Sequence, residues 1–132
     1  MRGVKGVIWY CWKETGDNTG VEGSGHHPAT QQVLKELVAE FKVLAPALMA
    51  PGGRMLKSKD GHVHALICGD GETGRYLVYV NADERASDAV LSVPDLAGKT
   101  LEGMFGAPEA AIQDGVLKIN VPALGTGVFQ IK

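Results

Sequence analysis

The sequence predicts a mainly β protein: an antiparallel β-sandwich of Greek-key-like order, preceded by one strand and one long α-helix. Three observations predict this fold. Residues 7–12 form an unbroken apolar run, and residues 28–50 repeat apolar side chains at helical spacing. From residue 52 onward, short stretches in which every second side chain is apolar are separated by turn residues. The chain of 132 residues therefore divides into a strand, loop and helix (1–51) and a sandwich (52–132).

The first element is the strand at residues 7–12, which is apolar on both faces. Both-sided apolar patterning is typical of a parallel strand that is covered on each side. Residues 13–27 follow as a polar, glycine-rich loop, because so many glycines disfavour regular structure. A loop of that length is either functional or mobile.

The second element is a helix that begins near Pro28, a residue favoured at the first helical position. Pro46 cannot continue the hydrogen-bond ladder and is expected to end or kink it, and Pro51 with two glycines closes the segment. We expect the helix to dock its apolar stripe on the sandwich. The stripe comprises Val33, Leu34, Leu37, Val38, Phe41, Leu44, Ala45 and Leu48, and the opposite face carries Lys35, Glu36, Glu40 and Lys42.

Six short strands are expected in the remainder of the chain. They lie at residues 62–68, 76–81, 89–93, 100–105, 116–121 and 126–131. Residues 70–74 are rich in turn residues and predict a hairpin loop, and Asp114-Gly115 is a strong turn signal. Closely spaced short strands of this kind indicate a sandwich or a small barrel.

Composition restricts the function classes. The formal net charge is −2 and the basic residues are scattered, so nucleic acid is not an expected partner. No apolar run is long enough to span a bilayer. Cys11 and Cys68 are far apart and are expected to be two free, mostly buried thiols. Nothing in the sequence indicates a compartment.

No metal or cofactor site is expected. Asp17 and Asn18 offer oxygen ligands, but the loop lacks the regular acidic spacing of a calcium loop. The adjacent His26 and His27 point in different directions. His62 and His64 are two apart on an expected strand and so would share a face, but no third ligand is visible in the sequence.

Two stretches resemble a known arrangement. The first is the strand ending Trp-Tyr-Cys-Trp-Lys-Glu, with its loop and the helix through residues 41–48; it resembles strand eight and helix eight of TIM-barrel glycoside hydrolases of the cellulase and β-galactosidase kind. The second combines residues 77–83, 90–94, 114–116 and 127–131, and is similar to the small antiparallel sandwich that often follows such barrels.

The resemblance implies that the catalytic chemistry lies outside this stretch. Glycoside hydrolysis needs two carboxylates, and the barrel strands that carry them in the family have no match here. Strand eight usually contributes an aromatic that stacks under a sugar ring; Trp12 matches that position, and Trp9 is the weaker candidate. Glu14 lies just beyond the strand and is expected to be a solvated loop residue.

These observations lead to the hypothesis of a C-terminal accessory domain of a glycoside hydrolase, non-catalytic as an isolated chain, whose parent binds carbohydrate. The backbone N–H and C=O groups of the strand at residues 7–12 would pair either with an edge of the sandwich or with a second copy of the chain. Pairing with a second copy would give a homodimer. The alternative is a stand-alone carbohydrate-binding sandwich. Tyr76 and Tyr79 are expected on opposite strand faces, which weakens that alternative. A complete enzyme is disfavoured because no paired catalytic constellation is present.

Overall fold

The fold is described from a computed structural model, which covers residues 28–132 with the exception of residue 109. Helix α2 spans Pro28–Met49. Eight strands follow: β1 Arg54–Lys57, β2 Val63–Asp70, β3 Gly74–Asn81, β4 Ser87–Ser92, β5 Leu101–Met104, β6 Ile112–Gln113, β7 Val116–Val121 and β8 Thr126–Ile131. A short 3-10 helix, η2, covers Pro94–Leu96.

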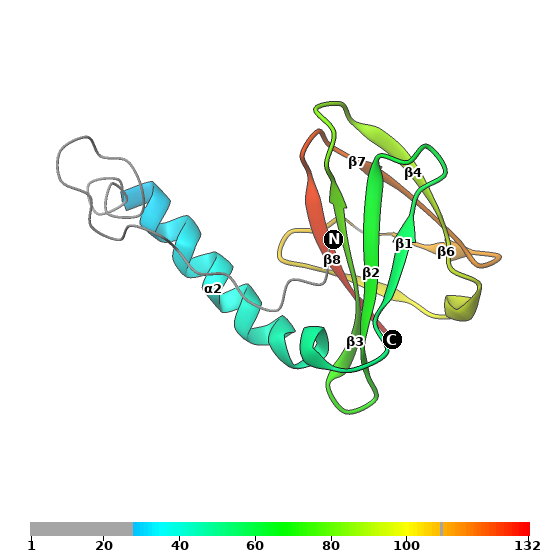
Figure 1. The fold of residues 1–132 in the computed structure, drawn as a ribbon, viewed down its shortest axis with the longest axis horizontal. Helices are drawn as coiled ribbons and strands as arrows, with labels where there is room; N and C mark the ends of the chain where they lie inside the picture. The colour runs from blue at the N-terminus through cyan, green and yellow to red at the C-terminus, as the bar shows by residue number, and fades with distance from the viewer. Residues whose placement is uncertain (1–27, 109) are drawn as a thin grey trace. The chain divides into compact units, whose positions relative to one another are not determined.

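The strands form two antiparallel sheets that face each other (Figure 1). The larger sheet has the order β1-β2-β3-β8-β5, and the smaller has the order β4-β7-β6. Four connections pass from one sheet to the other: β3 to β4, β4 to β5, β5 to β6 and β7 to β8. The predicted mainly β, antiparallel sandwich with one long helix is confirmed for the described residues.

The core lies between the two sheets, as strand alternation requires. From the large sheet, Leu77, Tyr79 and Phe129 are fully buried, and Leu91 and Leu117 of the small sheet belong to the same cluster. The rings of Tyr79 and Phe129 stack with their centroids 5.4 Å apart. Gly127 lies opposite Tyr79, where a Cβ atom would come within 2.3 Å of the phenol oxygen, so this position has no room for a side chain.

Two turns follow from local sequence. Asp114 and Gly115 both have positive φ values (50° and 71°) and join β6 to β7 as a two-residue hairpin, confirming the predicted turn. In the loop between β2 and β3, the Asp70 carboxylate accepts hydrogen bonds from the backbone N–H groups of Glu72 and Thr73 at 2.9 and 2.8 Å. These bonds lower the pKa of Asp70 and fix the hairpin.

Two details differ from the sequence prediction. Strands β1 and β6 were not expected, because β1 carries Arg54 and Lys57 at its ends and β6 has only two residues. His62 lies outside β2, so the histidine pair does not share one strand face. Helix α2 includes Pro46 and ends at Met49, just before Pro51, so the expected end of the segment is confirmed and the proline does not end the helix.

The last turn of α2 is stabilised by packing. Proline removes only the hydrogen bond to the preceding turn, and Ala50 N–H still donates to the Pro46 carbonyl at 3.1 Å. Ala47 is fully buried, and its Cβ atom lies where a side chain at Gly69 would clash at 2.9 Å. Position 69 needs a glycine mainly for the hairpin itself, because its φ is +84° and a Cβ atom would come within 1.9 Å of the Gly74 carbonyl oxygen; the approach of Ala47 adds to this need. Within the described residues, no helix is long and apolar enough to cross a membrane.

Candidate functional site

The outer face of the five-stranded sheet is the strongest candidate for a functional surface. Strand pairing aligns one side chain from each strand in a single apolar row across that face: Met55, Leu66, Val78, Val128 and Met104. Paired residues share a face, whereas their strand neighbours Ala65, Leu77 and Phe129 point into the core. We call these five residues the outer row.

The outer row is not part of the core between the sheets. Met55 is 45 % exposed, Leu66, Val78 and Met104 are half-buried, and Val128 is buried. An antiparallel sheet with one solvated face normally alternates apolar and polar residues. An apolar residue from every strand in register therefore indicates a face built for contact.

The rows on either side of the outer row carry charge of opposite sign. On one side are Lys57, His64, Val80 and Thr126; on the other are Cys68, Tyr76, Gln130 and Glu102. Desolvation, with a smaller effect of the Lys57 charge, lowers the pKa of His64. Glu102 forms an ion pair with Lys132. Lys57 thus carries the charge of the border near β1 and β2, whereas the charge of Glu102 on the other border is already balanced by Lys132.

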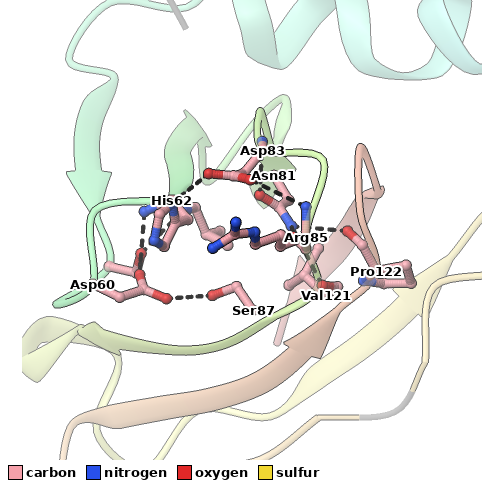
Figure 2. A network of polar contacts seen from close by, with 10 residues as sticks. Asp60, His62, Asn81, Asp83, Arg85, Ser87, Val121 and Pro122 are labelled. Atoms are coloured by element: carbon pink, nitrogen blue, oxygen red, sulfur yellow. Dashed lines mark hydrogen bonds and ion pairs between the residues drawn. The ribbon is translucent and has the colours of Figure 1, made fainter.

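One end of the sandwich carries a network of polar side chains (Figure 2). The Asp60 carboxylate accepts hydrogen bonds from the hydroxyls of Ser58 and Ser87 and from the His62 backbone N–H at 3.2 Å. These bonds lower the pKa of Asp60 to about 2. A carboxylate this weakly basic is a poor general acid or base near neutral pH, so the network is structural: it joins the β1–β2 loop to β4 of the other sheet.

Asn81 and His62 complete this end of the sandwich (Figure 2). The Asn81 side chain is buried, and its amide nitrogen donates to the carbonyls of Arg85 at 2.7 Å and Pro122 at 2.9 Å. Its amide oxygen accepts from the Asp83 N–H at 3.0 Å. His62 Nδ1 lies 2.8 Å from a carboxylate oxygen of Asp83. These contacts hold three loops together, and they satisfy backbone groups that the sheets leave unpaired.

Two open grooves offer weaker candidates. One, of about 610 Å³, lies on the outer face of the small sheet, where Lys59, Lys118 and Gln113 surround Val90 and Val116. The other, of about 530 Å³, lies near the β2–β3 hairpin and includes Arg75, Lys99 and Lys132. Two of these three cations are already paired, Arg75 with Asp95 and Lys132 with Glu102. Neither groove displays an aromatic side chain.

The residues singled out in the sequence have different outcomes. Trp12, Trp9, Glu14, Asp17, Asn18, His26, His27 and Cys11 lie outside the described residues, as does the strand expected at residues 7–12. Cys68 is free and buried, as expected, and burial raises the pKa of its thiol. In the described part of the chain, no three His, Cys, Asp or Glu side chains converge as metal ligands.

A sugar-binding sandwich would present two or three exposed aromatic side chains on one face. Tyr76 and Tyr79 do lie on opposite faces, and both are buried. Phe129 is in the core, and Phe105 is 43 % exposed in a turn. A flat platform of two or three exposed aromatics is therefore missing from the sandwich as described, in residues 52–108 and 110–132. The outer row itself was missed because a register across five strands is not visible in one sequence.

Comparisons with known proteins add no identification. No protein-family model matches this chain, and no curated protein sequence matches it significantly.

Proposed function

We propose that this chain is the C-terminal accessory part of a TIM-barrel glycoside hydrolase and is non-catalytic as an isolated chain. The sandwich covers the outer helices of the barrel and stabilises them. Hydrolysis of glycosidic bonds takes place at two carboxylates elsewhere in the parent protein. The order of residues 9–14, the helix and the sandwich strands, which resembles the end of such enzymes, supports this role.

The single observation that carries the proposal is the outer row. Helices pack on a sheet through an apolar stripe, and a sheet that receives them presents apolar side chains on that face. Met55, Val78 and Met104 extend such a surface from one edge strand to the other. The barrel is the partner because its outer layer is helical.

The alternative function, a stand-alone carbohydrate-binding sandwich, has less support. Sugar rings are held by stacking on exposed aromatic faces. Phe105 is the single exposed aromatic in the described part of the sandwich, and both tyrosines are buried. The structural role therefore remains the better proposal.

The decisive experiment is to sequence the DNA upstream of the Met1 codon. We expect an in-frame region encoding the earlier βα units of a barrel, with two acidic residues at strand ends. An immediate stop codon with no barrel coding region would overturn the proposal. Hydrolysis of aryl-glycosides by the purified 132-residue chain would overturn it as well.

A second experiment tests the surface within the full parent. Val78→Asp places a charge in the outer row, and Val90→Asp places the same charge on the outer face of the small sheet. Both valines are half-buried strand residues, so they are matched. We expect Val78→Asp to lower the thermal midpoint of the parent enzyme more than Val90→Asp does. Equal effects would show that the outer row does not contact the barrel.

A further inference from the structure

We draw no further inference here: the strongest candidate, the open groove on the outer face of the small sheet where Lys59 and Lys118 flank Val90, carries none, because nothing in residues 28–108 and 110–132 shows what fills it.

Discussion

The two faces of the five-stranded sheet are both apolar, but they differ in how they are covered. The inner face carries Leu77, Tyr79 and Phe129, which pack fully buried against the second sheet. The outer face carries Val78 and Met104, which are only half-buried and lie between rows that contain charged residues. The difference shows that the inner face stabilises the fold, whereas the outer face is only partly covered: Val128, Cys68 and Tyr76 are buried, but Met55 is 45 % exposed.

The largest loss of stability should come from truncating a large side chain on the inner face. We expect Phe129→Ala to lower the free energy of unfolding by about 3–5 kcal/mol, because it leaves a cavity in the core. Val78→Ala, on the adjacent strand but in the outer row, should cost about 1 kcal/mol or less. Urea unfolding followed by circular dichroism measures both. Equal losses would show that the outer face is also core within one chain.

A smaller effect should come from the buried amide at the end of the inner face. Asn81→Ala leaves the carbonyls of Arg85 and Pro122 without their donor, so we expect a loss of about 1–3 kcal/mol. Asn120→Ala is the matched control, because Asn120 donates at 2.7 Å to an exposed Asp88 carboxylate. The control should change stability by about 0.5 kcal/mol or less. If the two variants lose the same stability, the buried hydrogen bonds of Asn81 contribute no more than the exposed one of Asn120.

The Asp60 network predicts a dependence of stability on pH. The pKa of Asp60 is lowered to about 2 in the folded chain, so its contribution is fully present above the ordinary carboxyl pKa. It is lost as the pH falls from about 4 towards 2, because the proton then binds the unfolded chain more tightly. Urea midpoints of the unsubstituted 132-residue chain and of its Asp60→Asn variant, measured across this pH range, isolate the contribution of Asp60 to stability. The stability difference between the two proteins should shrink as the pH falls; a constant difference would contradict this account.

The smallest effect should come from the ion pairs at the other end of the sandwich. Asp95 pairs with Arg54 and, at 3.1 Å, with Arg75, and these side chains are about 40 % exposed. Solvent screens such pairs, so we expect Arg75→Ala to cost at most about 1 kcal/mol, and less in high salt. A larger loss of stability, measured by thermal unfolding, would show that these ion pairs stabilise the sandwich as strongly as the buried contacts of Asn81 do at the opposite end.

Much of the local structure could be predicted from patterns along the chain. The alternation in residues 116–121 and 126–131 matches β7 and β8 residue for residue. Asp114-Gly115 forms the turn that its dihedral preferences favour. Tyr76 and Tyr79 lie on opposite faces because side chains alternate along any strand. The candidate site could not be predicted in the same way, since the outer row combines five strands.

What the sequence by itself determined is therefore short-range: where strands and the helix form, where the chain turns, and which side chains share a face of one strand. Hydrogen bonding and side-chain periodicity within a few residues decide these features. Only the tertiary structure decided which face of the large sheet is covered by the second sheet. It also placed Asn81 beside Pro122 and brought Met55 into register with Met104. Such contacts join residues about 40 or more positions apart, and their pairing depends on the packing of the whole sandwich.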